Sequence, residues 1–383
     1  MFTKNILFKN FKKNSQNSKI KNKLKSLLSE DSQILKSLSK NYVNNFSKKN
    51  LEKYKKNINY RIIGMGGSSL GAKAIYDFLK HKIKKNFVFV DNLRSYDKKV
   101  KKKHLNLVIS KSGNTLETIV NANVLIKKNE KNIFITENKN SYLNFLAKKL
   151  KSEVIHHNNY IGGRFSVLSE VGMLPAELMG LNSNNFKQYN DLVKNKNFLN
   201  HLIVNVDAIL HYHKKKKFNS IIINYDEKSE SLFKWYQQLV AESLGKKNLG
   251  ILPVVSNMPK DNHSVMQLYL NGFKNNFFTF FYVKERNSLK LNSREILPLQ
   301  KNLKNNNIDK IIFAQKKATE NVFNKKNIPF RSFELNLRNE KTISEMFCFF
   351  ILETILIGKM LKINTFNQPA VEQIKNETMQ ILI

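Results

Sequence analysis

Residues 60–79, which read YRIIGMGGSSLGAKAIYDFL, decide the fold. The apolar run at residues 60–63 has the length of a buried strand, and residues 69–79 have the apolar spacing of a helix. Between them, the glycines of residues 64–71 let the backbone turn sharply and present its N–H groups to an anion at a helix start. A strand, a glycine loop and a helix in this order predict the first unit of a parallel α/β sheet.

The same alternation of strands and helices continues along the chain. Further strands are expected at residues 87–90, 105–109 and 132–135, and a second series at residues 220–224, 250–255, 277–283 and 310–314. Helices are expected at residues 115–127, 229–244, 264–272 and 341–361. Apolar strands that alternate with helices are typical of parallel sheets covered on both faces. We therefore predict an α/β fold with two doubly wound lobes and mainly parallel sheets.

These elements group into five segments along the chain. They are a basic and weakly helical segment at residues 1–56, the first α/β lobe at 57–175, a helical linker at 176–217, the second α/β lobe at 218–362, and a C-terminal helical segment at 363–383. Each predicted lobe has the size of an ordinary domain.

The net charge of +37 has two interpretations. It would suit a protein that binds nucleic acid or an anionic membrane. The lysines, however, are spread over the whole chain, arginine is scarce, and no basic stripe is interleaved with aromatic residues. We therefore interpret the charge as a compositional bias and expect neither a specific nucleic acid nor a membrane as a partner. A positive field would still attract an anionic substrate.

Composition also limits the class of protein. Hydrophobic residues make up 41% of the chain, which is enough for a sizeable core. The single cysteine, Cys348, excludes a disulfide framework and a cysteine-based zinc site, and it lies in an apolar run that predicts a buried helix. That run is too short for a bilayer span, and the N-terminal residues lack the apolar core of a secretory signal. The sequence thus predicts a cytoplasmic protein.

Residues 110–118, which read SKSGNTLET, also follow a predicted strand and open a helix. The hydroxyls of Ser110, Ser112 and Thr115 stand where the helix dipole favours negative charge. A helix cap would need only one of these hydroxyls, whereas a phosphate monoester offers three acceptor oxygens. Together with the glycine loop, this loop predicts a phosphate ligand at the carboxyl edge of the sheet.

The glycine loop on its own has other interpretations. A dinucleotide-binding fingerprint would need glycine where Ser69 stands, although Asp91, at the end of the next strand, could bind a ribose. A Walker loop would need lysine directly after Gly71, where Ala72 follows. A tight turn between strand and helix needs no ligand at all. Because no clean nucleotide motif results, we predict no cofactor.

One carboxylate lies on an apolar helix face. Trp235, Leu239 and Glu242 recur at helical spacing and share a face of the helix predicted at residues 229–244. Burial on such a face disfavours the charged form of a carboxyl group and raises its pKa toward values that suit a general base. A structural ion pair is the alternative interpretation of Glu242.

Three other residues are candidates for chemistry. Arg164 follows two glycines that expose the backbone, so it would neutralise an oxyanion or clamp a loop. His263 lies just before a predicted helix, where histidines are usually structural or solvated, and Lys375 is one lysine among many. No set of histidines and carboxylates has the spacing of a metal site, so no metal is predicted.

Taken in order, six segments resemble motifs of the phosphoglucose isomerase family. They are residues 64–71, 110–118, 162–172 (GGRFSVLSEVG), 235–246 (WYQQLVAESLGK), 261–267 and 366–375 (FNQPAVEQIK). Six motifs in the family's order are stronger evidence than any one of them. The resemblance implies two sugar-isomerase lobes and the reversible isomerisation of glucose 6-phosphate and fructose 6-phosphate through an enediolate, a step of glycolysis and gluconeogenesis.

The resemblance also implies roles for residues of this chain. Glu242 would carry a proton between C2 and C1, Arg164 would stabilise the enediolate, and His263 and Lys375 would serve ring opening. The substrate and its 6-phosphate would be bound by Gly67, Ser68, Ser110, Lys111, Ser112, Thr115, Gly163, Gln238 and Gln368. In this family the histidine comes from the neighbouring subunit, which implies a homodimer.

The chain departs from the family's motifs at three positions. Asn367 replaces the usual aspartate, Ala370 the usual glycine, and Ala72 the usual proline. Ala370 could alter the turn that aims Lys375, and the chain is short for the family, which leaves open how dimer arms would be built. Two related functions stay open: an isomerase that also accepts mannose 6-phosphate, and a non-catalytic regulator that binds sugar phosphates.

Overall fold

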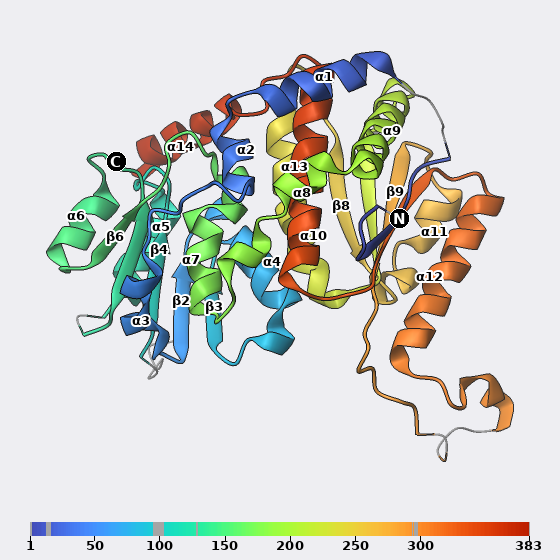
Figure 1. Cartoon of the computed structure of the whole chain (residues 1–383), viewed down its shortest axis with the longest axis horizontal. Coiled ribbons are helices and arrows are strands. Elements are labelled where there is room, and N and C mark those ends of the chain that lie inside the picture. Colours follow the sequence, from blue (N-terminus) through green and yellow to red (C-terminus); the bar gives the residue numbers. More distant parts are fainter. Residues whose placement is uncertain are drawn as a thin grey trace.

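The computed structural model of this chain describes residues 2–12, 17–94, 103–127, 129–292, 294 and 298–382. In this part of the chain, two five-stranded sheets stand side by side, with helices between and around them (Figure 1). All but one of the strand pairings are parallel. The predicted α/β fold with two mainly parallel sheets is confirmed.

The first sheet has the order β3-β2-β4-β5-β6 and is parallel throughout. Its strands are β2 (Asn59–Ile63), β3 (Asn86–Val90), β4 (Leu105–Ile109), β5 (Asn132–Thr136) and β6 (Glu153–His156), and the connecting helices are α4 (Leu70–Phe78), α5 (Leu116–Leu125) and α6 (Tyr142–Lys149). Every residue of β4 and β5 is buried, which is the pattern of central strands whose two faces are both covered.

The second sheet has the order β1-β10-β9-β7-β8. Its parallel strands are β7 (Asn219–Asn224), β8 (Leu252–Asn257), β9 (Asn276–Val283) and β10 (Phe330–Leu335), and its helices are α10 (Glu230–Leu244), α11 (Met266–Asn271), α12 (Ile308–Lys325) and α13 (Glu340–Met360). β1 (Ile6–Lys9) pairs with β10 in the antiparallel direction. The N-terminal segment therefore supplies an edge strand to the second lobe.

One predicted strand is wrong. Residues 310–314 lie inside α12, whose first turn is capped by the side chain of Asn307. A short apolar run such as KIIFA does not distinguish a strand from a buried helix segment. The strand beside β9 is instead β10, where Arg331, Ser332 and Glu334 interrupt the apolar residues and hide the strand pattern.

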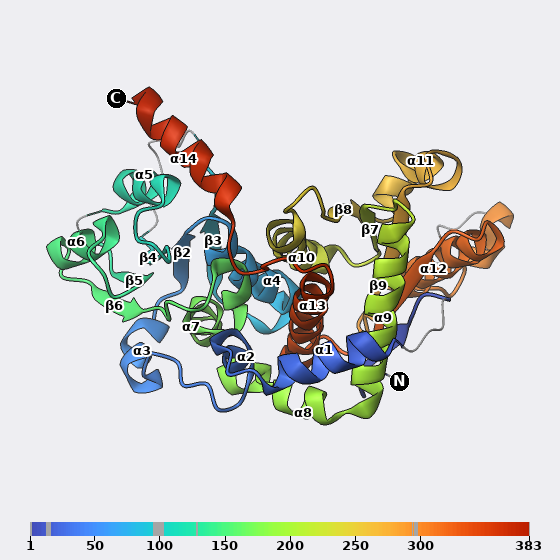
Figure 2. The ribbon, with the colours of Figure 1, turned by 90° about the horizontal axis from the view of Figure 1, so that it is seen from above.

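The remaining helices flank the two sheets. They are α1 (Ser18–Ser29), α2 (Gln33–Leu38), α3 (Lys48–Lys55), α7 (Glu170–Leu178), α8 (Tyr189–Lys194), α9 (Lys196–Lys214) and α14 (Pro369–Leu382). α14 has no buried residue and projects away from the body of the molecule (Figure 2). Within the ranges described, no helix is both long and apolar enough to cross a membrane.

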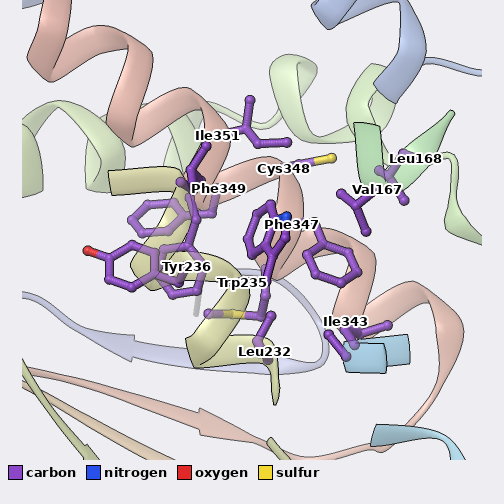
Figure 3. Packing of buried hydrophobic residues seen from close by; sticks show 14 of the residues in the cluster. Val167, Leu168, Leu232, Trp235, Tyr236, Ile343, Phe347, Cys348, Phe349 and Ile351 are labelled. Carbon is purple, nitrogen blue, oxygen red and sulfur yellow. The ribbon is translucent and has the colours of Figure 1, made fainter. Parts of the chain in front are cut away.

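The two lobes share a core at α10. This helix packs against α4 of the first lobe and α13 of the second. Trp235 is buried where α10 packs against α13, and its ring meets that of Phe347 edge-on at a centroid distance of 4.7 Å (Figure 3). Cys348 is buried in α13, as predicted. Packing on both sides fixes α10 firmly between the lobes, so it can hold a functional side chain in place.

Candidate active site

α10 positions the two side chains on which the site is built. Trp235 and Leu239 face the core, while Gln238 and Glu242 lie one turn apart and contact each other, Gln238 Nε2 donating to Glu242 Oε1 at 2.9 Å. The side chain of Glu242 retains 31% exposure and also accepts a hydrogen bond from Arg164. The expectation of a carboxylate in apolar surroundings is therefore wrong, because polar partners occupy both of its oxygens.

Arg164 lies at the centre of the site. It belongs to the short 3-10 helix η3 (Gly163–Leu168) and is only 2% exposed. Its Nε donates to Ser243 Oγ at 2.9 Å, Nη1 donates to Glu242 Oε2 at 3.0 Å and to Gln368 Oε1 at 2.6 Å, and Nη2 donates to the Thr365 carbonyl at 2.6 Å. Burial lowers the pKa of Arg164, and the charge of Glu242 acts in the opposite direction. The guanidinium thus joins η3, α10 and the segment before α14.

A lysine that sequence reasoning missed holds the same segment. Lys246 Nζ donates to the Asn364 carbonyl at 2.6 Å and to the Ser243 carbonyl at 3.1 Å. Burial, and then the charge of Arg164, lower the pKa of Lys246 to about 8. Lys246 and Ser243 both lie inside the 235–246 motif, which was the one feature of the sequence that could have pointed to them. Their partners outside the motif, however, are the Asn364 carbonyl and the Arg164 guanidinium, which lie in distant segments that no local pattern reports.

The glycine loop lies against η3, which we call the arginine turn because it carries Arg164. It begins at Gly64, directly after β2, and contains the 3-10 helix η1 (Gly66–Ser68). A Cβ added to Gly67 would lie 2.2 Å from the carbonyl carbon of Gly163, so the two backbones touch where any side chain on residue 67 would clash. A Cβ on Gly66 would lie 2.7 Å from Nε2 of Gln238. The loop therefore brings the carboxyl edge of β2 against both η3 and α10.

The predicted phosphate loop follows β4, the neighbour of β2 in the sheet. Ser110 Oγ and Thr115 Oγ1 share a hydrogen bond of 2.9 Å, and Ser112 Oγ accepts from the Asn114 N–H at 3.2 Å. Thr115 occupies the N-cap position of α5, but its side chain caps no backbone N–H. Helix capping therefore does not account for Thr115, and the loop leaves hydroxyls and a helix N-terminus available to an anion.

Lys111 belongs to the same loop and connects it to the arginine turn. Its Nζ donates to the Asn159 carbonyl at 2.7 Å and lies 3.5 Å from Glu137 Oε1. Asn159 belongs to the segment between β6 and η3. A side chain predicted to bind phosphate thus also contacts the segment that leads to Arg164.

The structure does not bring the last two predicted catalytic residues to the site. His263 is exposed in the 3-10 helix η6 (Lys260–His263), before α11. Lys375 is exposed on α14, where its Nζ donates to Glu372 Oε1 at 2.6 Å. Figure 2 shows α11 and α14 on opposite sides of α10. Among the described residues, the hydrogen-bond and ion-pair partners of Arg164 and Glu242 include neither His263 nor Lys375.

Two solved structures share the fold of this chain. A hypothetical protein from Thermus thermophilus matches with a TM-score of 0.83 at 21% identity, over 95% of each chain. A glucose-6-phosphate isomerase from Chlamydia trachomatis matches with a TM-score of 0.70 at 21% identity, over 88% of this chain and 72% of that one. At 21% identity, these likenesses show that the three chains share one α/β fold.

Sequence comparison shows the family of this chain. A family model described as phosphoglucose isomerase matches residues 12–250. The glucose-6-phosphate isomerase of Methanocaldococcus jannaschii is 34% identical, and the match covers 85% of each chain. This chain belongs to the phosphoglucose isomerase family.

Proposed function

We propose that this chain is a glucose-6-phosphate isomerase, which interconverts glucose 6-phosphate and fructose 6-phosphate. Family membership supports the reaction, and the observation that carries it is the placement of Arg164 Nη1 at 3.0 Å from Glu242 Oε2. Moving a carbonyl group from C1 to C2 requires one base and one positive group beside the developing oxyanion. The reaction gains and loses no electrons overall, so it requires no redox cofactor.

The reacting end of the sugar would lie between Glu242 and Arg164. Glu242 takes the proton from C2 of the aldose and returns it to C1, and the guanidinium stabilises the negative oxygen of the enediolate between these steps. Gln238 Oε1 is buried and has no hydrogen-bond partner within the described structure, so it is a free acceptor for a sugar hydroxyl. Gln368 Oε1 accepts a hydrogen bond from Arg164 Nη1 at 2.6 Å, so Gln368 would also lie beside the reacting end of the sugar.

The 6-phosphate would lie at the loop that follows β4. Ser110, Ser112 and Thr115 supply hydroxyls, α5 supplies backbone N–H groups and its positive end, and Lys111 supplies a charge. Ser68 and the backbone of Gly67 and Gly163 border the sugar. Binding of the phosphate at one end would hold C1 and C2 against Glu242 at the other end. Part of the binding free energy would thus serve to orient the reacting atoms.

Ring opening would need His263 and Lys375, and both lie away from Glu242 in a single chain. We propose that the active form is a homodimer in which His263 of one subunit completes the site of the other. We also place the reaction in the cytoplasm, because hexose phosphates are charged metabolites that do not cross membranes unaided.

A coupled assay with purified protein tests the function. Wild type is expected to convert fructose 6-phosphate to glucose 6-phosphate, and Glu242→Gln is expected to lose about a thousandfold in kcat. Glu230→Gln, at the first turn of the same helix, is the matched control and should stay near wild type. Failure of the wild type to turn over either hexose phosphate would overturn the function, and substantial turnover by Glu242→Gln would exclude Glu242 as the base.

A further inference from the structure

A buried histidine and glutamate lie behind the segment at residues 157–163. His157 follows β6 and is 3% exposed, and Glu170, the first residue of α7, is completely buried. His157 Nδ1 lies 3.2 Å from Glu170 Oε2, and His157 Nε2 lies 3.0 Å from the Ile161 carbonyl oxygen. Both ring nitrogens of His157 thus face oxygen atoms.

The partners of Glu170 determine its protonation state. Oε1 accepts hydrogen bonds from the Tyr42 hydroxyl at 2.7 Å and from the Asn45 N–H at 3.2 Å. Burial by itself would raise the pKa of Glu170, but the hydrogen bonds from His157 and Tyr42 outweigh burial and hold the pKa below its usual value. Glu170 is therefore a carboxylate that only accepts, as does the Ile161 carbonyl. Both nitrogens of His157 must then donate, which requires the doubly protonated ring.

We propose that His157 acts as an imidazolium that positions the arginine turn (η3) for isomerisation. The segment that it holds at Ile161 continues directly into Gly163 and Arg164. The same segment carries the Asn159 carbonyl, which accepts from Lys111 of the phosphate loop. His157 is thus a positioning residue, and it acts on the two ends of the site at once.

Loss of one ring proton would release this segment. A neutral ring keeps a lone pair on one nitrogen, and that lone pair would face either the Glu170 carboxylate or the Ile161 carbonyl. The other titratable groups around the pair are Tyr42 and Lys187. Burial and the charge of Glu170 raise the pKa of Tyr42, so its hydroxyl stays a donor. Lys187, whose Nζ lies 4.9 Å from the Tyr42 ring centroid, is the nearby positive charge that opposes the imidazolium.

Nuclear magnetic resonance of ¹⁵N-histidine-labelled protein tests the proton count without any assay of catalysis. The wild type is expected to show two ring N–H signals for His157 at neutral pH, and a single ring N–H would overturn the proposal. Glu170→Gln is expected to show one. In that variant the amide donates to Nδ1, its oxygen still accepts from Tyr42, and Nε2–H still donates to Ile161.

Kinetics test the consequence for the site, and this part of the inference rests on the proposed isomerase function. His157→Gln keeps one hydrogen bond and is expected to lose about tenfold in kcat/KM, while His156→Gln, an exposed neighbour, should match wild type. The ratio of kcat/KM for Glu170→Gln over wild type should rise with increasing pH, because only the wild-type pair depends on a second ring proton.

Two kinetic results would contradict a positioning role. One is a ratio that does not change with pH, and the other is His157→Gln behaving like His156→Gln. If His157→Gln does not fold, the ratio for Glu170→Gln still decides. If the wild type has no isomerase activity, the proposed function fails, whereas the resonance experiment still tests the imidazolium.

Discussion

At the scale of single residues, the contact between Gly67 and Gly163 is asymmetric. A Cβ on Gly67 would lie 2.2 Å from a backbone carbon, whereas a Cβ on Gly163 would meet its nearest atom, Gly67 Cα, at 3.7 Å. The first distance is a clash of the added Cβ with the backbone of residue 163, and the second is an ordinary van der Waals contact. One glycine of the pair is therefore required, and the other is replaceable.

We predict that Gly67→Ala destabilises the protein by about 2–4 kcal/mol, because the glycine loop must move away from η3. Gly163→Ala, the matched control, should change the free energy of unfolding by less than about 1 kcal/mol. Urea unfolding of both variants measures the difference. Equal destabilisation would show that the two loops do not meet as described.

The sequence allowed the prediction of most candidate site residues but of few of their contacts. Arg164 and Glu242 could be named because they lie in distinctive motifs. Ser243 and Lys246 could not be assigned roles, because Ser243 serves by accepting from Arg164 and Lys246 by donating to a carbonyl of residue 364. His157 was missed for the same reason, since its carboxylate partner lies 13 positions along the chain with no regular spacing.

At the scale of elements, Lys187 joins two segments that lie far apart in sequence. Its Nζ is buried and donates to the Leu168 carbonyl at the end of η3 and to the Ser37 carbonyl of α2. Burial lowers the pKa of Lys187 from 10.5 to about 8. Below that value, the folded protein bears the full free-energy cost of a buried ammonium group.

The sign of the pH dependence follows from this depressed pKa. Between pH 8 and 10.5, the unfolded chain binds the Lys187 proton more tightly than the folded protein does, so the free energy of unfolding rises with pH. Relative to Lys187→Met, the wild type should gain up to roughly 3 kcal/mol across this window. Urea unfolding at several pH values measures the gain, with Lys194→Met, an exposed lysine, as the control. A difference that does not change with pH would contradict the assignment.

Most elements were predictable, and the failures have a physical cause. Strands β4 and β7 are largely apolar runs in a sheet covered by helices, so composition marks them, whereas β2 buries Arg61 and is marked by the glycine loop that follows it. β10 was missed because it buries Arg331, whose guanidinium pairs with Glu353 from α13. Burial of a charge depends on a partner that only the fold supplies, and β1 depends likewise on an edge that only the assembled sheet offers.

At the scale of the whole molecule, a single chain leaves its predicted chemistry incomplete. His263, just before α11, and Lys375, on α14, are both exposed, and Figure 2 shows α11 and α14 on different sides of α10. α14 exposes Ile374, Met379, Ile381 and Leu382, each at 51–83%. A helix with an apolar face and no buried residue suits contact with a further surface, which is consistent with the proposed dimer.

Complementation between two inactive variants tests whether His263 acts across subunits. Glu242→Gln and His263→Ala are each expected to be nearly inactive as pure homodimers. A mixed dimer holds one site with both defects and one site with neither, because the intact Glu242 of one chain meets the intact His263 of the other. Mixing after reversible dissociation, or coexpression, should therefore restore about a quarter of the wild-type activity per chain. If His263 served its own chain, every site in a mixed dimer would carry one defect and no activity would return.

Size-exclusion chromatography with light scattering must show dimers in each sample, since a monomeric wild type that is active would also exclude a site shared between subunits.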